Sequence, residues 1–192
     1  MASIIVSGFA PFDGCPHNPS QELAQHVHGK EIAGVSIVGV VLPVVRYRSW
    51  DRLKDHISKH NPKAVIALGQ SNRAEINLER WAYNIDHYRI ADNEGNQPQD
   101  EVVVQTAPSR YPSTLPVERI EQSLRHAGCS TVFSDDAGRF VCNHLFFQMQ
   151  HALRETQIRS GFIHVPFRYQ SWVEEGIEQV IDVVSASLHG AT

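Results

Sequence analysis

Short runs of apolar, mostly β-branched residues recur along the chain, and longer amphipathic or polar stretches separate them. A continuous short apolar run that ends at a glycine, a proline or a polar cluster is typical of a strand buried on both faces. The expected buried strands are 4–7, 35–42, 64–69, 131–133 and 160–167.

Between these runs, apolar positions recur at helical spacing. In 46–60, Trp50, Leu53 and Ile57 share one face of a helix. Asn18 is a suitable N-cap for a helix that begins with Pro19. The expected helices run from 19 to about 28, over 46–60 and 115–127, from the turn at Gly138 to about 153, and over 171–188. Strands that alternate with helices predict an α/β fold with a mostly parallel sheet covered on both faces.

Other segments lack this regular pattern. Apolar and polar residues alternate in 76–85, which predicts extended chain, and the three valines of 102–104 predict a short strand. Residues 91–100 are polar and 107–116 are rich in proline, so both are expected to be irregular. No repeat, low-complexity segment or linker interrupts the chain, and we expect residues 1–192 to form one domain.

The turn at Gly138 stands out because a cysteine follows it at the start of a helix. The positive end of the helix dipole and unpaired backbone N–H groups lie there, and both stabilise a thiolate. Cys142 is therefore a candidate nucleophile. The alternative is that it packs as a small apolar residue, as most free cysteines do.

Two further polar residues interrupt apolar elements. His164 lies inside an expected strand, where it needs a hydrogen-bond partner; it is either a satisfied core histidine or a functional one. Glu79 follows an earlier strand and precedes Arg80, so an exposed ion pair between these neighbours is the alternative to a functional role. Catalysis by a thiol requires a nucleophile, a base and a group that orients the base. Cysteine, histidine and glutamate can fill these three roles.

Composition narrows the classes of function. The net charge is −4 and no run of lysine and arginine occurs, so we expect no nucleic-acid partner. Three cysteines at irregular spacing, Cys15, Cys129 and Cys142, fit a reducing cytosol rather than a disulfide framework. His56 and His60 have metal-ligand spacing but no third ligand beside them, so we expect no metal site.

Neither targeting nor membrane insertion is expected. The N-terminus has no basic segment before its short apolar run, and it predicts a first strand rather than a signal peptide. No apolar run approaches about 18 residues, so we expect no membrane span.

Several short segments, taken in order along the chain, form a recognisable set. They are Ser7–Phe12 with Asn18–Ser20, Gly69–Gln70 with Arg73, Ile76, Glu79–Arg80 and Asn84, Arg89–Asn93, Ala137–Gly138 with Cys142–Asn143, and Gly161–Pro166. These segments resemble the successive signatures of pyroglutamyl peptidase I, a family of cysteine peptidases, and the resemblance extends from about residue 4 to beyond residue 170.

The resemblance implies a specific fold and activity. It implies a three-layer α/β/α sandwich that removes N-terminal pyroglutamyl residues from peptides through a thioester, with Glu79, Cys142 and His164 as catalytic residues. It also implies a cytosolic homo-oligomer, often a tetramer, without metal or organic cofactor. The substrate-binding residues that it implies are Phe9, Phe12, Gln70, Arg89, Ile90, Phe140 and Val141, with Arg89 stabilising developing negative charge.

Some positions depart from the family pattern and leave alternatives open. Ala10 stands where many members carry an acidic residue, and Ser71-Asn72 replaces a small, glycine-rich pair. Arg139 stands beside the nucleophile segment, and Phe167 replaces a common tyrosine. A non-catalytic α/β module that binds pyroglutamyl ends is one alternative, and a redox-sensing thiol protein is another.

Overall fold

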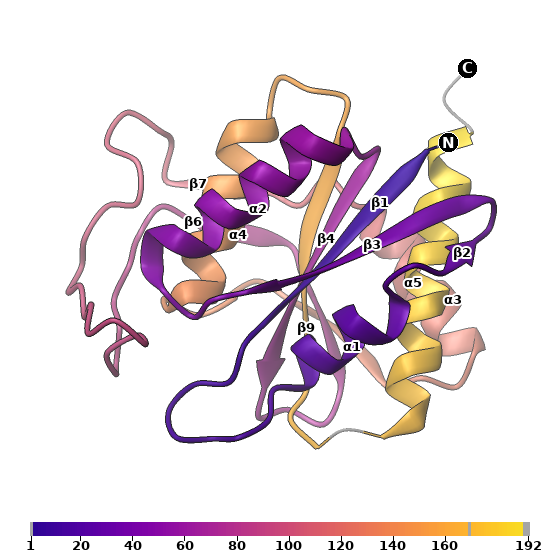
Figure 1. Ribbon diagram of the computed structural model, residues 1–192, viewed down its shortest axis with the longest axis horizontal. Coiled ribbons are helices and arrows are strands. Elements are labelled where there is room, and N and C mark those ends of the chain that lie inside the picture. The colour runs from indigo at the N-terminus through magenta and orange to yellow at the C-terminus, as the bar shows by residue number, and fades with distance from the viewer. Residues whose placement is uncertain (1, 169, 190–192) are drawn as a thin grey trace.

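The computed structural model describes residues 2–168 and 170–189, and Figure 1 shows how strands and helices alternate. In chain order the elements are β1 (Ser3–Phe9), α1 (Pro19–Val27), β2 (Glu31–Ile32), β3 (Val35–Leu42), α2 (Arg46–His60), β4 (Ala64–Ser71), β5 (Ile76–Glu79), β6 (Trp81–Tyr83), β7 (Arg110–Pro112), α3 (Val117–His126), β8 (Thr131–Ser134), α4 (Val141–Leu153), β9 (Arg159–Pro166) and α5 (Ser171–His189).

The seven-stranded sheet has the order β2-β3-β1-β4-β9-β5-β8. Strands β3, β1, β4 and β9 run parallel to one another. Strand β5 is antiparallel to β9 and parallel to β8, so the direction of the sheet reverses between β9 and β5. A small second sheet pairs β6 with β7.

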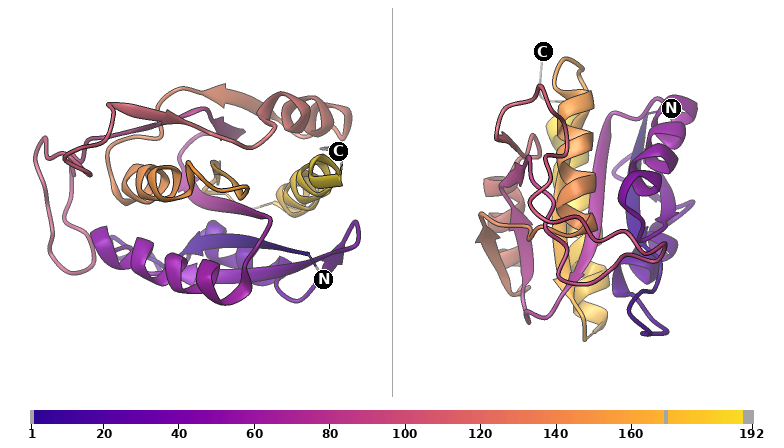
Figure 2. Two further views of the ribbon diagram at one scale, coloured as in Figure 1. Left: turned by 90° about the horizontal axis from the view of Figure 1, so that it is seen from above. Right: turned by 90° about the vertical axis from the view of Figure 1, so that its left-hand side faces the viewer.

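Helices cover both faces of the large sheet. Figures 1 and 2 show α2 and α4 on one side of the central strands and α1, α3 and α5 on the other. Alternate residues of each strand enter two separate apolar cores: Ile4 and Ile66 pack toward α1, α3 and α5, whereas Ile5 and Val65 pack toward α2 and α4. The predicted three-layer α/β/α sandwich is confirmed.

The first strand and the first helix meet at a tight backbone contact. The Asn18 side chain caps α1 by accepting from the Ser20 N–H at 3.1 Å, and Pro19 is the first helical residue, as predicted. The Ser20 hydroxyl in turn accepts from the Phe9 N–H at 3.0 Å. A β-carbon on Gly8 would lie 1.8 Å from the Ser20 carbonyl oxygen, so only glycine fits there.

Most predicted elements are present, and two predictions are wrong. Residues 102–104 form no strand; Glu101 makes an isolated bridge with Asp86, and the chain then turns. Residues 107–116, predicted to be irregular, contain β7. Both segments depend on their partners elsewhere in the chain, since an isolated valine run and a proline-containing strand carry weak local signals.

Substitution of Gly8 by alanine should strongly destabilise the fold. The new β-carbon would overlap backbone atoms of Ser20, which no side-chain rotation relieves. We expect the free energy of unfolding to fall by about 3 kcal/mol or more in urea titrations followed by circular dichroism.

Gly95→Ala is the matched control. Gly95 has a φ of 86° but nothing within 4 Å of the added carbon, so backbone strain alone should cost about 1 kcal/mol. Equal losses in the two variants would contradict the assignment of Gly8 to a steric contact.

Candidate active site

The pairing of β5 with β9 brings Glu79 and His164 together. In the register of this antiparallel pair, Glu79 lies opposite Phe162, and His164 lies opposite Asn77. Side chains two residues apart point to the same face, so Glu79 and His164 are diagonal neighbours on the face toward α4. The His164 Nδ1–H donates to Glu79 Oε1 at 2.8 Å.

Both members of this pair are buried. Glu79 is 2% exposed and His164 is 8% exposed. The alternative that Glu79 forms an exposed ion pair with Arg80 is wrong. Glu79 is buried, and the exposed Arg80 guanidinium instead donates to Asp135 at 2.7 Å. The histidine has the partner that a buried imidazole requires.

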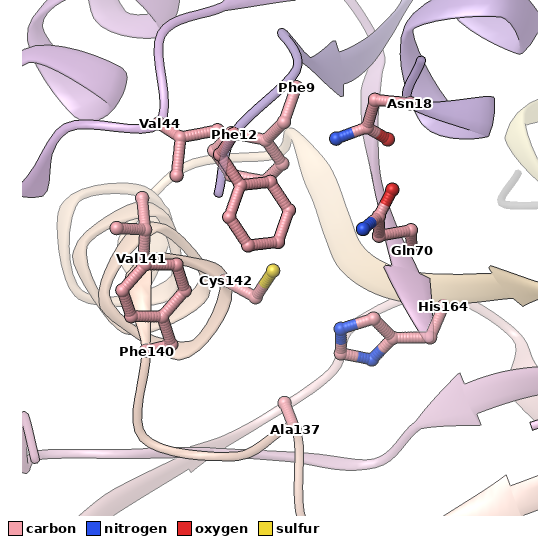
Figure 3. A pocket seen from close by; sticks show the side chains of 10 residues that line it. All are labelled: Phe9, Phe12, Asn18, Val44, Gln70, Ala137, Phe140, Val141, Cys142 and His164. Atoms are coloured by element: carbon pink, nitrogen blue, oxygen red, sulfur yellow. The ribbon is translucent and has the colours of Figure 1, made fainter. Parts of the chain in front are cut away.

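Cys142 occupies the first turn of α4, as predicted, and its sulfur lies beside the imidazole (Figure 3). Since Nδ1 of His164 is bound to Glu79, the remaining Nε2 forms the hydrogen bond with the Cys142 side chain. A β-carbon on Gly69 of β4 would lie 3.0 Å from this sulfur, so the glycine at this position leaves room for the sulfur. Sulfur, imidazole and carboxylate therefore form one hydrogen-bonded row.

The row holds a proton on His164. Burial lowers the pKa of the imidazole, but its hydrogen bonds with Cys142 and Glu79 outweigh burial and raise that pKa from 6.5 to about 10. An imidazolium between two anionic partners is the form that these contacts stabilise.

An apolar cavity of about 150 Å³ opens beside the sulfur. Figure 3 shows the rings of Phe12 and Phe140 on one side and the Asn18 and Gln70 amides on the other. The lining residues are Phe9, Phe12, Asn18, Val44, Gln70, Ala137, Phe140, Val141, Cys142 and His164. Five of the sequence-predicted substrate residues are thus gathered at this cavity: Phe9, Phe12, Gln70, Phe140 and Val141.

The other two predicted substrate residues lie outside the cavity lining. Arg89 is exposed and Ile90 is half-buried, and both belong to the long segment 84–109 that extends away from the sheet (Figure 1). Arg139 does not lie free beside the sulfur either. Its guanidinium donates to Asp136 and lies 4.6 Å from the centre of the Tyr83 ring.

The two residues directly after Cys142 hold it in place. From the sequence, Asn143 is marked only as part of the family signature, without a role, and His144 is not singled out. The Asn143 amide donates to the carbonyls of Tyr83 and Ile85 and accepts from the Tyr83 N–H at 2.9 Å. The His144 Nδ1–H donates to Asp86 at 2.7 Å, and both side chains are fully buried. The sequence signal that could have revealed these anchors is that Asn143 and His144 are polar residues in an otherwise apolar turn of the helix, where buried polar groups need hydrogen-bond partners.

A buried arginine extends this anchor to α2. The Arg46 guanidinium donates to Asp86 at 2.8 Å and to Glu101 at 2.7 Å, and its backbone N–H donates to Asp92 at 2.8 Å. These contacts connect α2, α4 and the segment 84–109 around the N-terminal end of α4.

The described residues contain no group of three or more histidine, cysteine, aspartate or glutamate side chains that could hold a metal ion. None of the described helices is both long enough and apolar enough to cross a membrane. The side chains at the cavity are a thiol, an imidazole beside it and a carboxylate that orients the imidazole.

Such a row beside an apolar pocket is typical of a thiol-dependent hydrolase, here on an α/β sandwich. The sequence model of the pyroglutamyl peptidase family matches residues 2–187. This chain belongs to the pyroglutamyl peptidase family.

Relatives and solved structures agree with this assignment. The chain is 45% identical to a pyrrolidone-carboxylate peptidase of Vibrio vulnificus over 86% of this chain and 79% of the relative. It is 39% identical to one of Bacillus cereus over 96% and 94%. The pyrrolidone carboxyl peptidase of Thermococcus litoralis superposes with a TM-score of 0.96 at 31% identity, covering 100% of this chain and 97% of that one. Pyroglutamyl peptidase I of Bacillus amyloliquefaciens gives 0.92 at 33% identity, covering 97% and 98%.

Glu79→Gln should lower the pKa of His164. The substitution keeps the shape and a hydrogen-bonding oxygen but removes the negative charge that stabilises the imidazolium. In wild type, the imidazolium should persist until the pH approaches about 10, and in the variant it should be lost at a lower pH. The His164 ring signal in pH-dependent NMR spectra, assigned with His164→Gln, measures this directly.

Glu178→Gln is the control for this titration, because Glu178 is hydrogen-bonded to a different histidine, His26. An unchanged His164 titration in Glu79→Gln would contradict the role assigned to the carboxylate.

Proposed function

We propose that this protein is a cysteine exopeptidase that hydrolyses the N-terminal pyroglutamyl residue from peptides. The observation that carries the proposal is the row of Cys142, His164 and Glu79 beside an apolar cavity. Membership of the pyroglutamyl peptidase family supports the same activity.

The cavity suits an uncharged ring. Pyroglutamate is a flat lactam without an α-amino charge, so its binding requires apolar faces and a few hydrogen bonds. Phe9, Phe12, Phe140 and Val141 supply the faces, and Gln70 lies where polar groups can meet the lactam. Apart from Cys142 and His164, the described residues of the lining include no ionisable side chain, so an ordinary N-terminal ammonium group would lose its hydration there without a carboxylate to pair with and would lie near the His164 imidazolium.

The first stage forms a thioester. The Cys142 thiolate attacks the pyroglutamyl carbonyl carbon, and the N–H groups in the first turn of α4 lie near the oxygen that becomes negative. The His164 imidazolium donates its Nε2 proton to the departing amine nitrogen, and the carbon–nitrogen bond breaks. Glu79 holds the ring so that Nε2 faces the sulfur.

The second stage releases the acid. Neutral His164 takes a proton from a water molecule, and the resulting hydroxide attacks the thioester carbon. The carbon–sulfur bond breaks, pyroglutamate leaves, and the thiolate–imidazolium pair is restored.

Some finer assignments rest on the family resemblance alone. These are a role for Arg89 and Ile90 in the substrate site, catalysis without metal or organic cofactor, a cytoplasmic location and a homotetrameric assembly. Arg89 is exposed, so its contribution to the transition state is open to a direct kinetic test with Arg89→Gln. The oligomeric state can be measured by light scattering.

Hydrolysis of a chromogenic pyroglutamyl amide, blocked by a thiol-alkylating agent, is the expected result for the proposed function. Cys15 is half-buried and lines a neighbouring cavity, so the assay should use Cys15→Ser to assign inhibition to Cys142. Tight binding of the pyroglutamyl amide without hydrolysis would instead support a non-catalytic module. The corresponding prolyl amide, which lacks the lactam carbonyl, serves as the control substrate.

Removal of the sulfur should cost more activity than removal of the carboxylate charge. Cys142→Ala should lower kcat/KM by more than about 10⁴-fold, whereas Glu79→Gln should lower it by about 10²- to 10⁴-fold, because orientation is only part of the work. A Cys142→Ala protein with full activity would refute the assignment.

The pH dependence of kcat/KM gives a separate test. Activity should fall at alkaline pH as His164 loses its proton, and this alkaline decline should move to lower pH in Glu79→Gln.

A further inference from the structure

We propose that the part of the peptide beyond the pyroglutamyl residue lies in a groove that leads from the cavity to Arg73 and Arg168, and that this groove favours peptides with a carboxylate downstream of the cleaved bond. The proposal rests on the proposed function, since it names the substrates that the same site prefers.

Three cavities adjoin one another in this region. Beside the pyroglutamyl cavity lies a second cavity of about 200 Å³, which shares Phe12 and Gln70 with it and is also lined by Asp13, Cys15, Asn72 and Phe167. A third cavity of about 560 Å³ shares Asn72 and Phe167 with the second. The shared residues make the three cavities successive neighbours that lead away from the sulfur, and we take them as one groove for the peptide.

The path lies on the side where the leaving peptide must depart. His164, the proton donor to the departing amine, belongs to β9, and Phe167 and Arg168 directly follow that strand. The neighbouring wall, 72–74, directly follows Ser71, the last residue of β4. The Phe167 N–H donates to the Ser71 carbonyl at 2.9 Å, so the two strand ends form one joined surface.

The far end of the path is cationic. Among the described residues, its lining includes Arg73 and Arg168 and no aspartate or glutamate. Both arginines are exposed, and within the described ranges no carboxylate lies within 4 Å of either. Arg73 donates one N–H to the Asn77 side chain at 3.1 Å, which directs the guanidinium without neutralising it.

The near and far parts of the groove differ in charge. Asp13 is the only carboxylate that lines the second cavity among the described residues, and it stands before the two arginines on the path. Glu75, on the same loop as Arg73, lines none of these three cavities. A peptide whose carboxylate lies some residues beyond the cleaved bond therefore meets the arginines, which bind carboxylates through paired N–H groups.

The groove also accounts for two departures from the family pattern. Asn72 and Phe167 form the wall that the second and third cavities share, and Phe167 is 42% exposed. They lie on the path of the leaving peptide rather than in the pyroglutamyl cavity, so we infer that they alter peptide preference more than recognition of the lactam.

A substrate series tests this assignment. The series comprises pyroglutamyl peptides with one to four alanines, each as a free acid and as a C-terminal amide, together with amidated peptides that carry glutamate or glutamine at the second or third position. The amidated set separates a side-chain carboxylate from a terminal one. A pyroglutamyl anilide, which does not extend along the groove, reports the basal activity.

In wild type we expect kcat/KM for the best-placed carboxylate to exceed that for its neutral counterpart by about three- to tenfold at low salt, because exposed ion pairs are weak. The preference should shrink at 0.5 M salt and disappear in Arg73→Gln/Arg168→Gln, with unchanged anilide hydrolysis. Arg52→Gln, which removes an exposed arginine on α2, should leave the preference intact.

The outcomes separate the two proposals. If the anilide is hydrolysed but acid and amide substrates are equivalent at every length, or the preference survives in the double variant, the groove assignment is overturned while the peptidase remains. If neither the anilide nor any peptide is hydrolysed, the proposed function fails and the groove assignment fails with it.

Discussion

The hydrogen bond between Glu79 and His164 is the contact on which the site depends. A carboxylate that is 2% exposed is costly unless a charged donor faces it, and the imidazolium of His164 is that donor. The same contact fixes the ring so that its second nitrogen faces the Cys142 sulfur. Stability of the buried pair and readiness for nucleophilic chemistry therefore come from one arrangement, because each anionic partner keeps the proton on the ring.

The position of the sulfur has its own support, which lies away from the reacting atoms. Asn143 binds backbone groups of residues 83 and 85, and His144 binds the buried Asp86. Arg46 continues these contacts to α2. The first turn of α4 is thus held from two sides, by a segment distant in the chain and by a neighbouring helix, which limits how far the Cys142 sulfur can move relative to His164.

Recognition is divided between two surfaces of opposite character. Apart from Cys142 and His164, the cavity beside the sulfur has no ionisable side chain in its described lining and suits the lactam, whereas the proposed groove ends at Arg73 and Arg168. A mainly apolar cavity discriminates by the cost of desolvating the wrong group, and an exposed charged groove adds only modest preference. The division is consistent with a site that selects the terminal residue strictly and the following residues loosely.

The sequence by itself determined the order of the helices and of the long buried strands, the cap at Asn18, and the residue types of the candidate site, because periodicity, turn residues and interrupted apolar runs are local signals. The resemblance to a known family linked Cys142, His164 and Glu79. Only the tertiary structure decided that β5 lies antiparallel to β9, which makes Glu79 and His164 diagonal neighbours, that Asn143 and His144 anchor α4, and that Arg89 lies outside the cavity lining. The pairing of strands distant in sequence depends on many long-range contacts at once, and no local pattern of residues records them.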